Sequence, residues 1–180
     1  PEHLEEVTAV SPRIVDVLNG YLRAVAVEDI EDPTALLGLR AQLLRRVQVD
    51  GGNYRDAYET NEQIIKLATS AHDPRNLALA NLGRVYRLIE NNDPAAALAL
   101  LETLGARYRD LDSLEFKAGF DALQGAAFSA VGQYDRALQR FLPALELVNN
   151  HPDLWSPRKA DILLAMARMY VNARDPVRAL

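Results

Sequence analysis

A short pattern recurs along this chain at intervals of about 40 residues. It is clearest at Gly132-Gln133-Tyr134-Asp135-Arg136-Ala137-Leu138 and reappears at Gly52-Asn53-Tyr54-Arg55-Asp56-Ala57. Looser copies are Asn92-Asp93-Pro94-Ala95-Ala96-Ala97-Leu98 and Arg174-Asp175-Pro176-Val177-Arg178-Ala179-Leu180. The alanines that align are Ala57, Ala97, Ala137 and Ala179. Self-similarity at this period is typical of solenoids, in which each repeat buries an apolar face of its neighbour.

The composition limits the classes of protein to which the chain can belong. Its 180 residues are 49% apolar and 25% charged, as in ordinary globular proteins. A net charge of −5 and scattered basic residues argue against direct binding of nucleic acid. Because cysteine is absent, disulfides and thiolate metal sites are excluded. No apolar run approaches the ~20 residues of a membrane helix, so we expect no membrane contact within this segment.

Prolines mark where helices are expected to begin. Six of the nine follow Asp or Ser, residues that accept hydrogen bonds at a helix N-cap and leave proline at the first helical position. They are Pro12, Pro33, Pro74, Pro94, Pro157 and Pro176. Between them apolar residues recur with helical spacing, and we expect Pro143 to kink the helix that contains it. The expected helices are 11–27, 33–50, 54–71, 74–91, 94–108, 113–131, 134–149 and 157–173, with a further start at 176.

This pattern predicts an all-α fold. No segment alternates apolar and polar residues for long enough to form a strand, and the short connections favour antiparallel helix pairs. Each helix has an apolar face wide enough to require neighbours on both sides, which stacked pairs provide. We expect an N-terminal capping helix in 1–32, followed by about three and a half repeats. Their bounds are 33–72, 73–111, 112–152 and a truncated 153–180.

The helix pairs and their small residues resemble the tetratricopeptide repeat family over residues 33–180, nearly the whole chain. Where that family has a small residue in the first helix and an alanine in the second, this chain has Gly83 and Gly125, then Ala97 and Ala137. The aromatic positions of the family are matched by Tyr86, Phe128, Tyr170 and Phe141. The chain departs from the family in its longer period, in Arg45 and Gln48 at two signature positions, and in having no tryptophan signature.

The resemblance implies a right-handed superhelix of helix pairs whose concave groove binds a peptide. Long repeats of this kind look like those of bacterial regulators, including transcription regulators and the sensor regions of diguanylate cyclases. The chain is therefore expected to be the sensory or interaction segment of a larger bacterial signalling protein.

In that family the first helix of each repeat lines the groove. One residue beyond its small residue stand Arg46, Arg84, Ala126 and Arg168, with Arg87 one turn further and amides at Gln42, Asn81 and Asn172. Guanidinium groups suit carboxylates, so we expect an acidic peptide or chain terminus as ligand. The alternative is that these arginines pair with neighbouring glutamates or stay solvated. A chaperone-type carboxylate clamp is not supported, because Gln42, Gly119 and Leu123 occupy its positions. Trp155 is either a packing plug or an interface anchor.

Residues for catalysis do not form a recognisable pattern. The histidines, His3, His72 and His151, lie outside any zinc-binding spacing, and Gly51-Gly52 lacks the strand and the Gly-Lys-Ser/Thr of a phosphate loop. We therefore expect no enzyme, no cofactor and no metal.

The ends of the chain suggest a piece of something longer. It opens on Pro1 without methionine and stops at Leu180, one turn into an expected helix. The expected partner is a protein or peptide, and the alternatives are self-association as a homodimer or sensing of a small ligand. The cytoplasm is the default compartment and a periplasmic sensor region the alternative.

Overall fold

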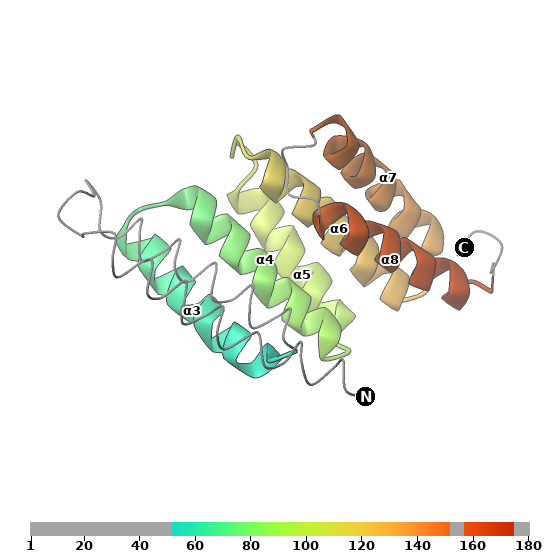
Figure 1. Ribbon diagram of the computed structural model, residues 1–180, viewed down its shortest axis with the longest axis horizontal. Coiled ribbons are helices and arrows are strands. Elements are labelled where there is room, and N and C mark those ends of the chain that lie inside the picture. The colour runs from blue at the N-terminus through green and yellow to red at the C-terminus, as the bar shows by residue number, and fades with distance from the viewer. Residues whose placement is uncertain (1–51, 152–156, 175–180) are drawn as a thin grey trace, which may run out of the picture. The chain divides into compact units, whose positions relative to one another are not determined.

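The computed structural model describes residues 52–151 and 157–174, all of whose regular elements are helices. The expected helices 11–27 and 33–50, the cap 1–32, Trp155 and the start at 176 lie outside the described residues. The six helices expected between residues 54 and 173 are confirmed, each end within one residue. They are α3 (Tyr54–Ser70), α4 (Pro74–Glu90), α5 (Pro94–Arg107), α6 (Leu114–Ala130), α7 (Tyr134–Asn150) and α8 (Pro157–Asn172) (Figure 1).

The turns between these helices repeat one backbone geometry. A residue with positive φ follows the helix end at His72 (53°), Asn92 (58°) and Gly132 (75°). The next residue then donates its N–H to a carbonyl five residues back, as Asp73 does to Ala68 at 2.9 Å. This is the hydrogen-bond pattern of a Schellman motif, which closes a helix in the fewest residues. Glycine adopts this conformation without strain, whereas His72 and Asn92 adopt it as L-residues.

The residue that closes one helix also opens the next. Asp93 donates its N–H to Leu88 at 2.9 Å, and its carboxylate accepts the N–H of Ala96 at 3.1 Å. Asp73 caps α4 in the same way, through Asn76 at 3.0 Å. This arrangement sets the starts of α4 and α5 at residues 74 and 94. The starts of α3, α6 and α7, at residues 54, 114 and 134, keep the same 20-residue interval, although Tyr108 ends α5 and a separate residue, Ser113, caps α6. Two such steps give the 40-residue period of the sequence.

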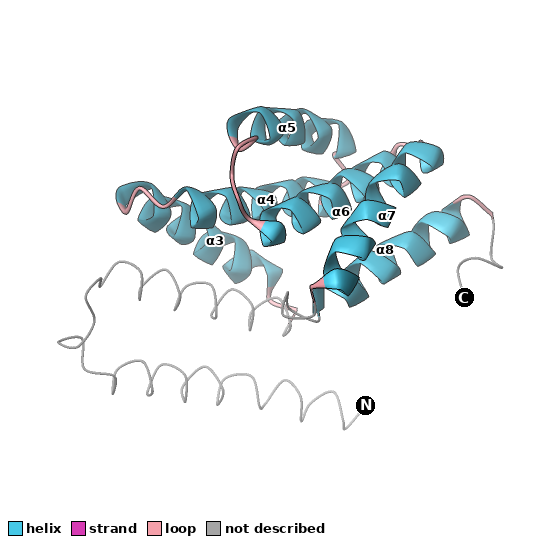
Figure 2. Ribbon diagram, turned by 90° about the horizontal axis from the view of Figure 1, so that it is seen from above, coloured by secondary structure: helices cyan, strands magenta, loops and turns pink. Residues whose placement is uncertain are grey.

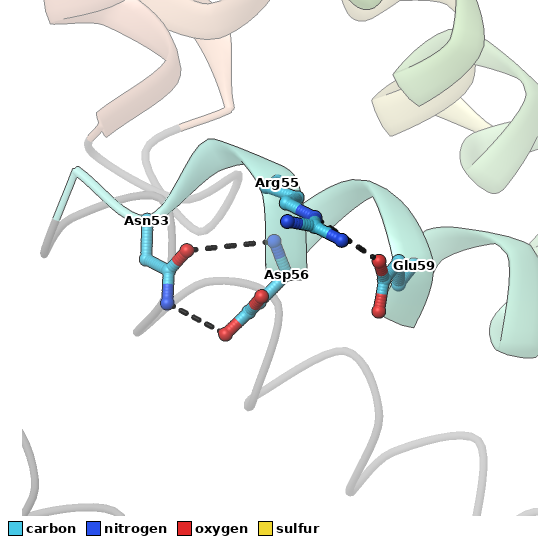
Figure 3. A network of polar contacts seen from close by, with 4 residues as sticks. All are labelled: Asn53, Arg55, Asp56 and Glu59. Carbon is cyan, nitrogen blue, oxygen red and sulfur yellow. Dashed lines mark hydrogen bonds and ion pairs between the residues drawn. The ribbon is translucent and has the colours of Figure 1, made fainter.

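The start of α3 has a polar network of its own (Figure 3). The side-chain oxygen of Asn53 accepts the backbone N–H of Asp56 at 3.5 Å, and its amide nitrogen donates to the Asp56 carboxylate at 2.6 Å. Arg55 pairs with Glu59 one turn on, at 3.5 Å on the solvent side. An exposed pair at this spacing contributes only about 0.3–0.5 kcal/mol. The network therefore marks the helix start more than it stabilises the fold.

The chain divides into two compact units, and the division falls inside α4, between Ala80 and Asn81. In the first unit, Ile64 of α3 packs with Ala80 of α4, and both are nearly inaccessible to solvent. The buried amide of Asn61 donates to the Ala80 carbonyl at 2.9 Å, a bond between the two helices. Burying an amide is costly unless it is paired, so this bond fixes the register of α3 against the start of α4.

In the second unit α6 is the central helix, since it packs against α5, α7 and α8 (Figure 2). The inner face of α7 carries four buried residues at spacings of four, three and four, which is one side of a helix. They are Ala137, Phe141, Ala144 and Val148. With Phe128 of α6 and Ile162 and Met169 of α8 they form the core of this unit.

Gly125 allows α6 and α7 to approach closely. A Cβ atom at this position would lie 2.7 Å from the Phe141 ring, closer than real atoms pack. Phe141 itself has no exposed surface. Pro143 lies on the exposed side of α7, as does Gln139, whose carbonyl receives no N–H from the proline.

Candidate functional site

The arginines that the sequence singled out lie at the surface. Arg84 and Arg87 are exposed one turn apart on α4, and Arg168 is exposed on α8. Arg84 and Arg87 already take part in interactions within the chain. Positions 84, 126 and 168 are separated by 42 residues each, and the middle one is the half-buried Ala126 of α6. The second unit therefore exposes basic groups on its first and last helices and a methyl group at the equivalent position between them.

The amides expected beside these arginines do not share one environment. Asn172 is exposed near the end of α8, whereas Asn81 is buried, with 7% of its surface exposed, and is engaged within the chain. An interior amide is committed to the fold and is a poor candidate for contacting a ligand. Gln42 and Arg46 lie outside the described residues.

The residues of the repeat pattern occupy distinct structural places. The aligned alanines Ala57, Ala97 and Ala137 are 2%, 0% and 0% exposed. Gly52 and Gly132 are turn residues with positive φ, and Tyr54 and Tyr134 each begin a helix. Among the matched aromatics Phe128 is buried at 7% and Tyr170 half-buried, but Tyr86 is 39% exposed, so these three do not pack alike. Gly83 is half-buried, and Ala179 lies outside the described residues.

A cavity that sequence reasoning missed lies where α5 passes into α6. Its volume is about 160 Å³, and three aromatic rings contribute to its wall. The full lining is Gly105, Tyr108, Arg109, Leu111, Phe116, Lys117, Phe120 and Asp121. Its only sequence signal is a cluster of aromatic residues on either side of a helix end. The volume suits one apolar side chain or a single ring rather than a cofactor, which needs at least about 300 Å³.

The Tyr108 ring contacts two other side chains beside this cavity. Its ring meets Phe116 edge-on at 5.5 Å between centroids, and the Arg107 guanidinium lies 5.4 Å from its centroid. The hydroxyl oxygen is buried and has no hydrogen-bond partner among the described residues. Such an orphaned hydroxyl costs about 1–3 kcal/mol, so the tyrosine is held here by its ring rather than by its polar atom.

One ion pair crosses between α6 and α7. Arg140 lies 3.5 Å from the carboxylate of Asp121, whose side chain is 26% exposed. Burial raises the pKa of the Asp121 carboxyl above its usual value, while the charge and the hydrogen bond of Arg140 oppose that rise.

Groups for metal binding are missing from residues 52–151 and 157–174, where no three His, Cys, Asp or Glu side chains converge. His72 is an exposed turn residue and His151 a half-buried residue at the end of α7. Each described helix is too short or too polar to span a lipid bilayer.

An apolar surface on α8 is the second feature that the sequence did not reveal. Leu163, Leu164 and Val171 are 45%, 53% and 59% exposed, which is high for large aliphatic side chains. The opposite side of α8 is in the core through Ile162 and Met169, at 2% and 1%. The helix is thus apolar on both sides but covered on one.

No protein-family model and no curated protein sequence matches this chain.

Proposed function

We propose that this chain is a peptide-binding helical repeat protein of the tetratricopeptide kind, and that its ligand is an acidic peptide segment. The observation that carries the proposal is the exposure of Arg84 and Arg168 at positions two repeats apart in the second unit. They stand on an otherwise acidic chain of net charge −5. Basic residues at two of three positions spaced 42 residues apart suit a ligand with spaced carboxylates, because a guanidinium binds a carboxylate through paired hydrogen bonds.

The chemistry of arginine makes the existing contacts of this surface compatible with a ligand. A guanidinium has five N–H donors in a planar fork, so an interaction within the chain leaves donors for a second acceptor. Arg84 and Arg87, both exposed, are one turn apart, close enough to hold two carboxylates of one peptide. In this proposal the chain is the sensory or interaction segment of a larger bacterial signalling protein, and it carries out no chemistry itself.

The test measures binding of two labelled peptides by fluorescence anisotropy. In one peptide glutamates alternate with leucines, and in the other glutamines replace the glutamates. We expect the first to bind more tightly, and its binding to weaken as salt is raised, because charges at a surface are screened. The double variant Arg84→Glu/Arg87→Glu should weaken that binding at least ~10-fold, since charge-assisted hydrogen bonds contribute about 1.5–3 kcal/mol each.

The control is Lys66→Glu/Lys159→Glu, which changes the net charge equally at exposed positions on α3 and α8. It should bind the glutamate peptide as the unmodified chain does. Equal binding of the two peptides, or equal loss in both double variants, would overturn the proposal.

A further inference from the structure

The uncovered side of α8 has a regular pattern of residues. Asp161, Leu164, Arg168 and Val171 follow one another at spacings of three, four and three. At 100° per residue they fall within a sector of about 80° of the helix. All four are exposed, and we call them the outer face of α8. Two large aliphatic side chains thus alternate with one acid and one base along a single line.

The corresponding positions of α6 are covered. Forty-two residues before the four outer-face residues stand Gly119, Ala122, Ala126 and Ser129 of α6. Gly119 is buried and the other three are half-buried, and Ala122 and Ala126 pack against the core. The repeat therefore packs this side of its first helix on α6, whereas on α8 the same side exposes aliphatic residues. Exposed apolar stripes of this kind mark interfaces.

The charges on the outer face are complementary to those of a second copy. Suppose that two α8 helices pack antiparallel, with a two-fold axis between residues 164 and 165. Residue 161 lies as far before this axis as residue 168 lies after it. Residue 161 of each copy therefore faces residue 168 of the other. The dimer then contains two symmetric Asp161–Arg168 pairs, and we call the place of each pair a crossing. The two Leu164 side chains meet beside the axis. In a parallel arrangement Asp161 would face Asp161 and Arg168 would face Arg168, which is repulsive.

We propose that the outer face of α8 binds the same face of a second copy, antiparallel, to form a two-fold symmetric homodimer. An isologous contact of this kind needs only one self-complementary patch. The aliphatic side chains drive association, and the Asp161–Arg168 pairs set its direction, since pairs at a rim contribute little affinity but much specificity. Asp161 already takes part in an interaction within its own chain, and its two carboxylate oxygens accept several hydrogen bonds.

The contact is small, so the dimer is a weak one. Interfaces below about 1,200 Å² belong to transient complexes, and we expect half-association at roughly 10–100 µM. Sedimentation equilibrium over that range should show the mass rising from one chain to two. Leu164→Glu should abolish the rise, and because Leu164 is 53% exposed the variant should keep the helical circular dichroism of the parent.

Charge reversal tests the geometry. Arg168→Asp places two aspartates at each crossing, and Asp161→Arg places two arginines there, so each variant alone should be monomeric. An equimolar mixture of the two restores an Asp–Arg pair at both crossings and should dimerise again, as should the double variant Asp161→Arg/Arg168→Asp. Lys159→Asp, an exposed change on the same helix outside the outer face, should dimerise as the parent does.

Either of two results would overturn the inference. One is a monomer at every concentration up to about 1 mM. The other is dimerisation of both single variants as strong as that of the parent, which is the result a parallel contact gives. Arg168 takes part in both proposals, but the peptide test uses Arg84 and Arg87 and the dimer test also uses Leu164, so failure of one proposal can be told from failure of the other.

Discussion

At the scale of single residues, Gly125 sets the distance between two helices. Any larger side chain there meets the Phe141 ring near its point of attachment, at 2.7–2.9 Å, where the ring cannot swing away. Gly132 differs, because its surroundings are open and only its φ of +75° favours glycine. The two glycines of one repeat are thus required for unrelated reasons, the first for packing and the second for backbone conformation.

We predict that Gly125→Ala lowers the free energy of unfolding by about 1–3 kcal/mol, as overpacking of a core does, although alanine favours the helix. Urea unfolding followed by circular dichroism measures it. Adding Phe141→Leu should recover part of the loss, because the smaller side chain gives room to the new methyl group. The matched control is Gly132→Ala, which should cost about 1–2 kcal/mol through its φ alone. Recovery of Gly132→Ala by Phe141→Leu would contradict this explanation.

His72 is the non-glycine counterpart of Gly132, and its φ of 53° carries a conformational cost. Its ring nitrogen Nδ1 lies 3.2 Å from the Ser70 carbonyl at the surface, a contact worth little in water. We predict that His72→Gly raises the free energy of unfolding by about 0.5–1 kcal/mol. His72→Ala should give no such gain, since alanine keeps the strain. A gain in both variants, measured by urea unfolding, would show that the imidazole rather than the backbone is responsible.

At the scale of elements, α6 and α7 are joined by the Asp121–Arg140 pair as well as by their core. Because burial raises the pKa of Asp121, the folded chain holds this proton to a higher pH than the unfolded chain does. The contribution of the protonated carboxyl to stability is therefore fully present below the unfolded pKa, near 3.8, and is lost as pH rises through the folded value.

We predict that Asp121→Asn gains stability relative to the parent as pH rises from about 4, because asparagine has no proton to lose. Urea titrations of both proteins across that range give the difference in unfolding free energy. In Arg140→Gln the pKa of Asp121 should climb further, so the decline in stability should extend to higher pH. A difference between parent and Asp121→Asn that shrinks with rising pH would show that the ion pair outweighs burial.

The sequence predicted the bounds of the helices well but predicted less well which sides of the helices are buried. Helix ends were predictable because Asp73 and Asp93 are both the closing residue of one helix and the cap of the next, and such residues are readable as Asp-Pro. The burial of Asn81 was not predictable from the sequence. Helical periodicity alone does not tell which side of a helix faces a neighbouring helix when several sides do. The cavity beside Tyr108 depends on how two helices diverge after residue 107, which no local pattern encodes.

At the scale of the whole molecule, α6 makes its main contacts with three helices of the second unit. These are α5, α7 and α8, and the contact with α7 is the most extensive. Local opening is rarest where buried contacts are most numerous. We predict that the amides in the middle of α6 exchange with deuterium most slowly, by at least ~10-fold relative to those of α8. Hydrogen exchange with mass spectrometry checks this, and slower exchange in α5 or α8 would contradict it.

The arginine positions show what the period of a repeat can and cannot predict for the molecule. The sequence placed Arg84, Arg87 and Arg168 at the surface, and the structure has them exposed. The exposed leucines of α8 were missed because a solenoid pattern assumes that every apolar face is covered by the following helix.

The 20-residue interval between helix starts governs how such a chain can change its length. Each tight turn reverses the direction of the backbone, so inserting one helix with its turn would invert every helix that follows and present the wrong sides to one another. Inserting two helices with their turns restores both the direction of the helices that follow and the sides that they present to one another. Duplication or deletion of a segment therefore preserves helix packing only in steps of about 40 residues. A one-helix insertion between α3 and α4 should fail to fold, whereas a two-helix insertion should fold.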